Sequence, residues 1–217
     1  MCKLCQKLND CVLEVGAMAV SAEVNGPGHR LAIWLQGCPF NCKGCFNPEF
    51  RPMKRGKKIN AASVLQTAAE HGVEGLTFTG GEPFMQAKAL GLLAGAAREQ
   101  GLGIVCYSGF YLDELKKGEV PGSPGLLKNT DLLIDGPFKE DLQGPFCWRG
   151  SSNQGIHCLS SRYMREAEAA MDSHTRAAEV VVGSGEMFIT GIFPMEFWNR
   201  LEARLKNRVP QETGEQR

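Results

Sequence analysis

Three cysteines, Cys38, Cys42 and Cys45, stand close together in the stretch GCPFNCKGCFN. Their thiolates are soft ligands that suit an iron–sulfur cluster or zinc. A four-iron cubane normally takes four cysteines, so a cluster held by three keeps one iron with an open coordination position. Such an opening is useful only where a small reactant has to bind the metal. The three cysteines therefore predict a metal centre that takes part in chemistry.

Zinc is the alternative at these cysteines. A zinc site would need a distant His or Cys as its fourth ligand, and Cys-x-x-x-Cys-x-x-Cys does not match the usual paired zinc spacings. Purely structural cysteines fit less well, because the stretch is rich in turn formers and poor in core residues. The spacing favours a cluster over zinc.

A second group of cysteines, Cys2, Cys5 and Cys11, lies at the N-terminus. Cys2 and Cys5 have Cys-x-x-Cys spacing and could join Cys11 in a second cluster or a zinc site. No fourth ligand stands nearby in the sequence, so three free thiols are the simpler interpretation. Cys106 lies within a predicted strand and is expected in the hydrophobic core.

The composition is that of a globular protein without a general charge preference. Apolar residues make up 43% of the 217 residues, and 24 Lys and Arg balance 24 Asp and Glu. This balance argues against a general affinity for nucleic acid or anionic membranes. Asp10 and Glu14 interrupt the apolar residues near the N-terminus, so a signal peptide is not expected. We expect a cytoplasmic protein whose cysteines serve metal or redox chemistry rather than disulfides.

The three-cysteine stretch follows the first of several predicted strands. Alternating strands and helices predict an α/β fold with a mainly parallel sheet. The unusual loops GCPFNCKGCFN, TGGEP, YSG and DGPF all follow strands, so we expect them at the carboxyl edge, where such sheets carry their chemistry. The predicted strands are 29–37, 76–81, 102–109 and 130–136, and the predicted helices are 60–72, 86–101, 111–118 and 161–172.

The C-terminal part is predicted to form a hairpin and a helix. AEVVVGSGEMFITG (178–191) has a Gly-Ser-Gly turn between two apolar runs, which is typical of a hairpin. A helix with one apolar face follows, because apolar residues recur every four positions at Phe193, Phe197, Leu201 and Leu205. The chain thus divides into an N-terminal segment (1–20), a core (21–160), an extension packed on the core (161–208) and a frayed tail (209–217).

The turn TGGEP, from Thr79 to Pro83, follows the second predicted strand. Paired glycines let a backbone approach a ligand closely, their carbonyls can accept from an ammonium group, and Glu82 adds negative charge. The cysteine spacing together with this turn resembles the radical S-adenosylmethionine (SAM) superfamily. The resemblance implies that Gly80, Gly81 and Glu82, with Thr79 beside them, hold the amino end of the methionine moiety.

Further strings narrow the resemblance. They are VNGPGHR (24–30), YSGF (107–110), DEL (113–115), LIDGPF (133–138) and WRGSSNQ (148–154). In order and approximate spacing, from about residue 20 to 158, the chain resembles the activating proteins of anaerobic ribonucleotide reductases. The resemblance implies a partial (β/α) barrel of the radical SAM type, here with a C-terminal hairpin and helix added.

The resemblance also implies an activity, that of a glycyl radical enzyme activase. Cys38, Cys42 and Cys45 would hold a [4Fe–4S] cluster, and SAM would chelate the fourth iron through its amino and carboxylate groups. One electron from an external donor, such as flavodoxin or ferredoxin, would cleave SAM to methionine and a 5′-deoxyadenosyl radical. That radical would take a hydrogen from a glycine Cα of the partner enzyme.

Contacts to the rest of SAM follow from the same resemblance. Gly44, Cys45 and Phe46 are expected to offer backbone and ring to the adenine. Contacts to ribose or methionine are expected from residues at later strand ends, with ordinary turn polarity as an equal alternative. These residues are Tyr107, Ser108 and Asp135.

Arg149 is expected to grip the SAM carboxylate, since a guanidinium binds a carboxylate in two places. Pinning its own loop or touching the partner are the alternatives for this side chain. The chain departs from the activators at Glu82, where they commonly carry Asp, and at Phe46, where they carry Tyr. Neither change threatens cluster or SAM binding. The additional residues at both ends leave the identity of the partner open.

Two other functions stay open on these patterns. One is a radical SAM enzyme that acts directly on a small molecule or peptide, with the C-terminal extension closing the pocket. The other is a non-enzymatic iron–sulfur or zinc protein, a sensor or scaffold. The Gly-Gly-Glu-Pro turn argues against the non-enzymatic alternative, since a scaffold has no need of a site for the methionine amino group.

Overall fold

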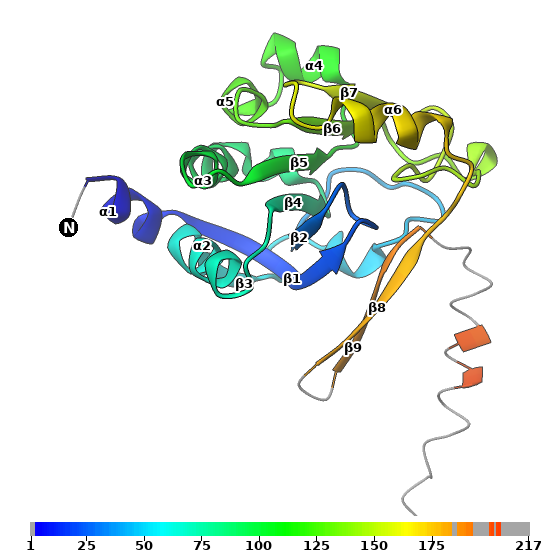
Figure 1. The fold of residues 1–217 in the computed structure, drawn as a ribbon, viewed down its shortest axis with the longest axis horizontal. Coiled ribbons are helices and arrows are strands. Elements are labelled where there is room, and N and C mark those ends of the chain that lie inside the picture. The colour runs from blue at the N-terminus through cyan, green and yellow to red at the C-terminus, as the bar shows by residue number, and fades with distance from the viewer. Residues whose placement is uncertain (1–2, 184–185, 193–199, 202, 205–217) are drawn as a thin grey trace, which may run out of the picture.

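The computed structural model describes residues 3–183, 186–192, 200–201 and 203–204. It contains a seven-stranded sheet with helices on its faces and a separate hairpin that extends from one end (Figure 1). The sheet has the order β3–β1–β2–β4–β5–β6–β7, and the hairpin is β8–β9.

The strands are β1 (Val12–Ala22), β2 (His29–Leu35), β3 (Lys57–Asn60), β4 (Gly75–Gly80), β5 (Gly103–Tyr107), β6 (Leu132–Asp135), β7 (Gly155–Cys158), β8 (Ala178–Gly183) and β9 (Glu186–Gly191). The α-helices are α1 (Lys3–Asp10), α2 (Ala61–Glu70), α3 (Ala87–Glu99), α4 (Leu112–Lys117), α5 (Ser123–Leu127) and α6 (Met164–Asp172). Short 3₁₀ turns are η1 (Pro48–Phe50), η2 (Pro83–Gln86) and η3 (Glu140–Leu142).

The centre of the sheet is parallel. β2 pairs with β4, β4 with β5 and β5 with β6, each in parallel register. Helices α2, α3 and the pair α4–α5 lie in the connections between these strands. The predicted α/β alternation is therefore confirmed, and the carboxyl ends of four neighbouring strands meet at one edge.

Antiparallel strands flank this centre, and the sequence patterns do not predict them. β3 pairs with β1 and β1 with β2 on one side, and β7 pairs with β6 on the other. β1 is hard to recognise because small residues blur the alternation in VLEVGAMAVSA. The register shifts around Gly16, where a Cβ atom would overlap the ring of Phe50.

Helix boundaries follow the predicted capping signals. The Asn60 side chain accepts a hydrogen bond from the backbone N–H of Ser63 at 2.8 Å, which caps α2. α3 begins after a 3₁₀ turn because Pro83 opens that turn, and Gly101, with a φ of 84°, follows its end. The predicted helices at 111–118 and 161–172 correspond to α4 and α6.

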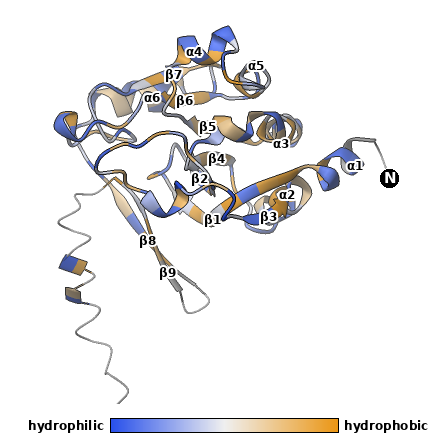
Figure 2. Ribbon diagram, turned by 180° about the vertical axis from the view of Figure 1, so that it is seen from behind, coloured by the Kyte–Doolittle hydropathy of each residue, from blue (hydrophilic) through white to orange (hydrophobic). Residues whose placement is uncertain are grey.

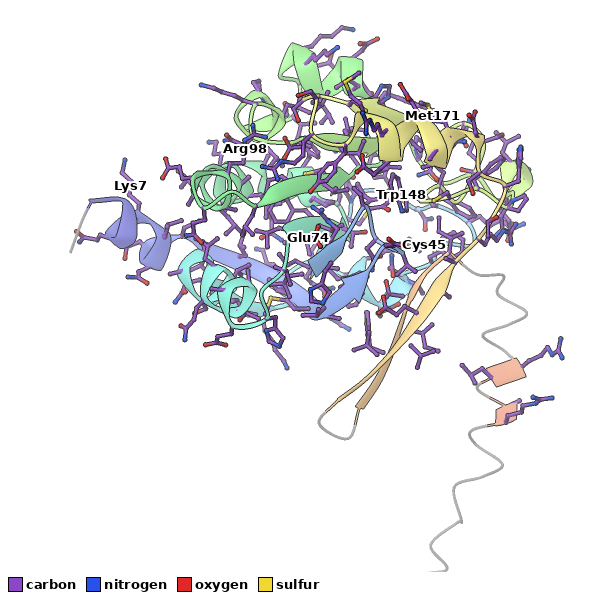
Figure 3. The ribbon with its side chains drawn as sticks, viewed as in Figure 1. Lys7, Cys45, Glu74, Arg98, Trp148 and Met171 are labelled. Carbon is purple, nitrogen blue, oxygen red and sulfur yellow. The ribbon has the colours of Figure 1, made fainter. Side chains whose placement is uncertain are left out.

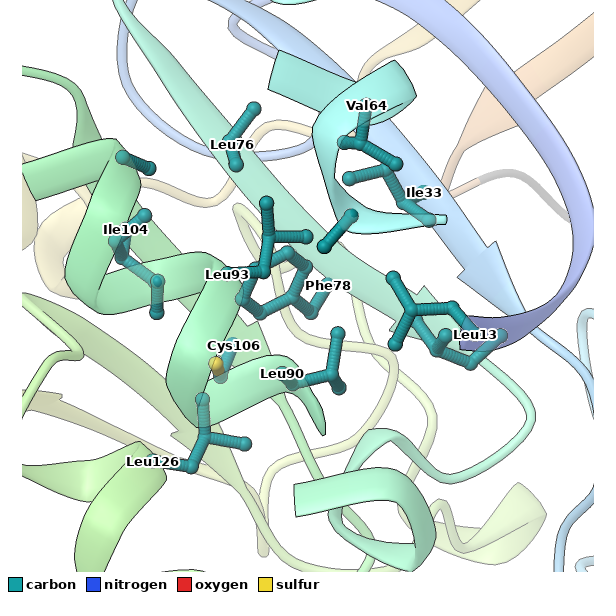
Figure 4. Close-up of a cluster of buried hydrophobic side chains, with 14 of the residues drawn as sticks. Leu13, Ile33, Val64, Leu76, Phe78, Leu90, Leu93, Ile104, Cys106 and Leu126 are labelled. Carbon is teal, nitrogen blue, oxygen red and sulfur yellow. The ribbon is translucent and has the colours of Figure 1, made fainter. Parts of the chain in front are cut away.

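The largest hydrophobic cluster lies between the sheet and helices α2 to α5. Figure 4 shows strand residues Phe78 and Ile104 meeting Leu93 of α3 within this cluster. Successive strand residues point to opposite faces, so Val105 packs instead in a second cluster that includes α6. Cys106 is fully buried in the first cluster, which confirms its predicted place in the core.

Arg30, at the amino end of β2, is fully buried on the α6 side of the sheet. Burial lowers the pKa of its guanidinium. It donates to the hydroxyls of Thr77 at 2.7 Å and Tyr163 at 2.8 Å, and to the carbonyls of Pro27, Leu76 and Gly103. A Cβ atom at Gly75 would lie 2.6 Å from Nη2, so this glycine makes room for the guanidinium.

The C-terminal extension begins with α6 and the hairpin. β8 and β9 pair from Ala178↔Gly191 to Gly183↔Glu186, which confirms the predicted hairpin; its turn, residues 184–185, lies outside the described residues. The predicted apolar stripe Phe193, Phe197 and Leu205 also lies outside them, as do Cys2 and the side chain of Cys5. A second metal site at the N-terminus therefore stays a prediction.

Hydrophobic residues colour much of the central strands in Figure 2, whereas α4 shows hydrophilic colours at the surface. Across the described part of the chain, no helix has the length and apolar character needed to cross a membrane.

Candidate active site at the carboxyl edge of the sheet

A cavity of about 170 Å³ opens at the carboxyl edge of the parallel strands. The loops after β2, β4, β5 and β6 all contribute to its lining, and so does the base of the hairpin. Cys45 and Trp148, which both line the cavity, lie at this end of the molecule in Figure 3. The expected meeting of the four loops is confirmed.

The cysteine loop after β2 is anchored by backbone hydrogen bonds. Gly37 N–H donates to the Phe50 carbonyl at 2.8 Å, and Cys38 N–H donates to the Arg51 carbonyl at 3.0 Å. Pro48 starts the 3₁₀ turn η1, which brings Phe50 back beneath the loop. The chain therefore closes on itself around the three cysteines.

The three thiols line one cavity and suit a cluster. Burial raises the pKa of Cys38 to about 11 and also raises the pKa of Cys45, so both side chains are thiols in the protein alone. The positive charge of bound iron would favour the thiolate form. Within the described residues, no three His, Cys, Asp or Glu side chains are gathered tightly enough for a single metal ion. A cubane is larger than one ion, and its cysteine ligands stand farther apart. This donor set fits an iron–sulfur cluster.

Paired glycines join the turn after β4 to the cysteine loop. Gly80 has a φ of 98°, and a Cβ atom there would lie 2.6 Å from the Leu35 nitrogen. A Cβ atom at Gly81 would overlap the carbonyl of Gly37. The glycines are therefore required by close packing of two backbones, which is a stronger reason than approach to a ligand alone.

Glu82 is buried and holds the neighbouring loop. Its Oε1 accepts from Phe84 N–H at 2.9 Å and from the Ser108 hydroxyl at 3.0 Å, and its Oε2 accepts from Gly109 N–H at 2.7 Å. Burial raises the pKa of Glu82 to about 7, although these hydrogen bonds oppose the rise. The carboxyl group thus ties the loop after β5 to the turn after β4.

The structure brings most of the predicted site residues to the cavity. Phe46 packs edge-to-face on Phe138, with ring centroids 5.0 Å apart. Burial raises the pKa of Tyr107, so its hydroxyl stays protonated. The predicted residues that line the cavity are Cys38, Cys42, Cys45, Phe46, Thr79, Gly80, Gly81, Glu82, Tyr107 and Ser108.

Three predicted residues, Gly44, Asp135 and Arg149, are not among those that line the cavity. Gly44 has a φ of 69° and lies beside Glu140. Arg149 Nη1 donates to the Gln154 carbonyl at 3.1 Å, and its guanidinium lies 5.0 Å from the Phe146 ring centroid. This geometry matches the alternative in which Arg149 pins its own loop.

Asp135 is occupied by groups of the protein. It accepts from Leu112 N–H at 2.7 Å and Gly155 N–H at 3.1 Å, and His157 Nε2 lies 2.9 Å from its Oδ1. Burial acts to raise the pKa of Asp135, but His157 and the two backbone donors outweigh it and lower the pKa. His157, on the unpredicted strand β7, has no ligand spacing that could have revealed this contact.

Other cavity residues escaped the sequence analysis. Trp148, with a φ of 58°, donates its indole N–H at 2.7 Å to the carbonyl of Glu23, which has a φ of 63°. Thr190 of β9 donates its hydroxyl at 2.9 Å to Asn25 Oδ1. Trp148 and Asn25 lie in the strings WRGSSNQ and VNGPGHR, which could have suggested them, but Thr190 follows no motif.

Arg51 also lines the cavity and was not predicted. It stands six residues after Cys45, and a single arginine at that distance has no recognisable motif. Its position depends on the turn η1, which folds the chain back toward the cysteines.

The region that contains Cys38, Cys42 and Cys45 matches a known protein family. Residues 24–157 match the family model described as a 4Fe–4S single cluster domain. Anaerobic ribonucleoside-triphosphate reductase-activating proteins are similar to the chain. That of Salmonella typhi is 31% identical over 147 residues, 63% of this chain and 92% of that protein. That of Escherichia coli (strain K12) is 30% identical over 146 residues, with the same coverages of 63% and 92%.

The activating protein of Enterobacteria phage T4 is 30% identical over 140 residues, 61% of this chain and 86% of that protein. Among solved structures, QueE from Escherichia coli has a TM-score of 0.40 and 16% identity, covering 50% of this chain and 57% of that chain. The match to the activating protein of Salmonella typhi leaves more than a third of this chain uncovered, and the 4Fe–4S family model ends at residue 157, before the C-terminal hairpin.

Proposed function

Because this chain belongs to the family of anaerobic ribonucleoside-triphosphate reductase-activating proteins, within the radical SAM superfamily, we propose that it generates a glycyl radical on an anaerobic ribonucleotide reductase. It is a radical SAM iron–sulfur enzyme, and its cofactors are a [4Fe–4S] cluster and SAM. The observation that carries the proposal is the meeting of three cysteine thiols and a Gly-Gly-Glu-Pro turn in one cavity.

The protein's own part in the reaction is to bind and orient these groups. When bound, the cluster and SAM would supply one-electron reductive cleavage of SAM and the radical chemistry that removes a hydrogen from the partner's glycine Cα. Cys38, Cys42 and Cys45 hold the cluster. The carbonyls of Gly80 and Gly81 would accept hydrogen bonds from the methionine amino group.

Most of the remaining predicted contacts are retained as part of the proposal. Glu82 acts mainly by fixing the turn, because its oxygens are taken up by hydrogen bonds within the protein. Adenine contacts are proposed for Gly44, Cys45 and Phe46, with Thr79 beside the glycine pair. Ribose or methionine contacts are proposed for Tyr107 and Ser108. Asp135 instead holds the neighbouring backbone in place, because it accepts hydrogen bonds from Leu112 N–H and Gly155 N–H.

Aromatic side chains shield the cavity from water. Phe46 and Phe138 pack edge-to-face, and Phe40 and Phe110 do the same, with centroids 4.8 Å apart. Exclusion of water protects a reactive radical from side reactions. Aromatic walls suit a reaction whose chemistry belongs to the cofactor.

We propose further that the sheet is a partial (β/α) barrel of the radical SAM type, with residues 21–160 as its core. We propose residues 161–208 as an extension of that core and 209–217 as a tail. Residues 1–20 are kept as the N-terminal segment, although β1, which begins at Val12, pairs with β2 and β3 in the sheet. An external one-electron donor such as flavodoxin or ferredoxin reduces the cluster.

The decisive experiment uses anaerobically reconstituted protein, dithionite, SAM and a candidate reductase. We expect 5′-deoxyadenosine together with a doublet from a glycyl radical in the electron paramagnetic resonance (EPR) spectrum of the reductase. A reductase with its radical-site glycine changed to alanine is the matched control and should give no organic radical. Formation of 5′-deoxyadenosine without any radical on the intact reductase would contradict this partner.

A second candidate function is favoured by the hairpin. Thr190, Gly191 and Ile192 line the cavity, so the extension narrows access to it. A radical SAM enzyme that acts directly on a small molecule or peptide would use such a wall. Mass spectrometry of reaction mixtures distinguishes the two candidates: a modified metabolite or peptide supports the second, and a radical on the reductase supports the first.

A further inference from the structure

Arg51 has a buried polar atom without a hydrogen-bond partner. Its backbone is fixed, since the Arg51 carbonyl accepts from Cys38 N–H and its own N–H donates to the Pro48 carbonyl at 3.3 Å. Its side chain is tethered at one point, where Nη2 donates to Asn41 Oδ1 in the cysteine loop. Nε is buried and unpaired. A buried charged donor without an acceptor is costly, so this group calls for an explanation.

The cavity does not supply that acceptor. Arg51 is the only Lys or Arg among the described residues that line it, and Glu82 is the only carboxylate there. Both Glu82 oxygens already accept from Phe84, Ser108 and Gly109. None of the ion pairs found in the described residues involves Arg51. Among the described residues, the Arg51 guanidinium therefore lines the cavity without a carboxylate partner of its own.

The other arginine considered for an anion is differently placed. The Nε of Arg149 is also buried and without a hydrogen-bond partner, but Arg149 does not line the cavity, and its guanidinium contacts the Gln154 carbonyl and the Phe146 ring. Arg51, in contrast, is linked by its carbonyl to Cys38 and by Nη2 to Asn41, which places it against the cysteine loop.

We propose that Arg51 binds the carboxylate of SAM, an assignment that rests on the proposed function. SAM carries a sulfonium and an ammonium group, which are both cationic, and one carboxylate, so only the carboxylate attracts a guanidinium. Nε and an adjacent Nη of a guanidinium form a fork that matches two carboxylate oxygens. The carboxylate supplies the acceptor that Nε lacks, and Arg51 thereby orients the amino-acid end of SAM beside the cysteines.

The test compares SAM with decarboxylated SAM, which keeps both cationic groups and loses the carboxylate. Dissociation constants for both ligands are measured by calorimetry and by the change in the EPR spectrum of the reduced cluster. For Arg51→Gln we expect SAM to bind roughly tenfold to a hundredfold more weakly. Decarboxylated SAM should bind Arg51→Gln and the unchanged protein equally, within about twofold.

Matched variants make the comparison specific. Arg149→Gln should keep the preference for SAM over decarboxylated SAM, and so should Arg165→Gln, which changes an exposed arginine outside the cavity. Arg51→Lys keeps the charge without the fork, so its loss of preference should be smaller than that of Arg51→Gln. This variant also provides the comparison if Arg51→Gln does not fold.

Two results would overturn the assignment. One is that Arg51→Gln, or Arg51→Lys in its place, weakens both ligands equally. The other is that Arg149→Gln removes the preference for SAM while the Arg51 variants keep it. If instead the unchanged, cluster-loaded protein binds neither ligand, the proposed function itself fails, so the two failures are distinguishable.

Discussion

Two arginines, one at each end of the parallel strands, differ in how fully the protein satisfies their hydrogen-bond donors. At the amino end, Arg30 is fully buried and makes five hydrogen bonds to hydroxyl and carbonyl oxygens. At the carboxyl end, Arg51 leaves Nε without a partner, beside three thiols that line a cavity. The donors of Arg30 are used to hold the interior together, whereas Nε of Arg51 is left to bind another group.

The difference separates scaffold from site. Polar groups that support a fold have their partners within the protein, and each unmatched buried group needs another explanation. In parallel sheets the amino edge is associated with stability and the carboxyl edge with chemistry. Arg30 and Arg51 follow this division, and substitutions at the two edges should therefore have different consequences.

The largest effect is expected at the cysteines. The cluster has only three cysteine ligands, so substitution of Cys38, Cys42 or Cys45 by alanine should prevent stable cluster binding. Formation of 5′-deoxyadenosine should then fall to background. The iron content and the absorbance of the reconstituted protein should fall in parallel. Cys106→Ala, in the core of the same sheet, is the control and should keep the cluster. Retention of a SAM-responsive cluster in Cys42→Ala would show that Cys42 is not a required cluster ligand.

Arg30→Met should have the largest effect on stability. It leaves the hydroxyls of Thr77 and Tyr163 and three carbonyls without their buried donor, which should lower the free energy of unfolding by about 3–5 kcal/mol. Chemical denaturation measures the change, with the exposed Arg165→Met as control, expected within about 0.5 kcal/mol. A loss below about 1 kcal/mol would mean that the Arg30 network is not what holds the amino edge.

Gly81→Ala probes the packing between the turn and the cysteine loop. The added methyl group would overlap the Gly37 carbonyl, so we expect a destabilisation of about 1–3 kcal/mol and weaker cluster retention. Gly125 in α5 has open space around its Cα, and Gly125→Ala should be neutral or slightly stabilising. Equal behaviour of the two variants in denaturation and iron analysis would refute the packing argument.

Asp135 lies at the carboxyl edge of the sheet, yet its side chain is paired within the protein, as that of Arg30 is at the amino edge. Its pKa is lowered in the folded protein, so its ionised form stabilises the fold above the ordinary Asp pKa of about 3.9. This contribution is lost as the pH falls through the lowered folded-state pKa. Asp135→Asn should cost about 1–2 kcal/mol at neutral pH.

The check on Asp135 is denaturation of both proteins at pH 7 and pH 3. The stability gap between Asp135→Asn and the unchanged protein should narrow at the lower pH, because acid removes the same charge that the substitution removes. A gap of equal size at both pH values would show that the ionised carboxylate is not the stabilising form.

The smallest effect is expected at the base of the hairpin. Thr190→Val removes one neutral hydrogen bond to Asn25 and should cost about 1 kcal/mol. Limited proteolysis should cut the chain near the hairpin faster than in the unchanged protein. Val180→Thr, on a half-exposed position of the same hairpin, is the control and should leave cleavage unchanged. Similar cleavage of both variants would argue that Thr190 does not fasten the hairpin.

The parallel centre of the fold and most of the site were predictable from local patterns. Apolar strands ending in glycine placed the cysteine loop, TGGEP and YSG at one edge, and helix α2 begins at the predicted Asn60 cap. The flanking strands β1, β3 and β7 were not predictable, because β3 (KKIN) and β7 (GIHC) lack the apolar run that marks β6 (LLID) and β1 is rich in small residues.

Side-chain partners over long sequence distances escaped prediction for a different reason. Asp135 was expected to contact a ligand, but its partner His157 lies on β7, whose pairing with β6 local patterns do not reveal. Arg51 and Thr190 reach the cavity through a turn and a hairpin that bring distant chain segments together. Residue type and spacing therefore point to the cysteines as metal ligands. They do not show which arginine lines the cavity beside those cysteines.

The anchoring of the cysteine loop bears on how the protein recovers from damage by oxygen. Gly37 and Cys38 are held by backbone hydrogen bonds to Phe50 and Arg51, and Glu82 N–H donates to the Gly37 carbonyl at 2.9 Å. None of these bonds involves a metal, in contrast to small domains whose folding depends on metal binding. We therefore expect the loop to keep its shape when air removes iron and sulfide, so that repair needs reduced cysteines and a fresh supply of these inorganic parts.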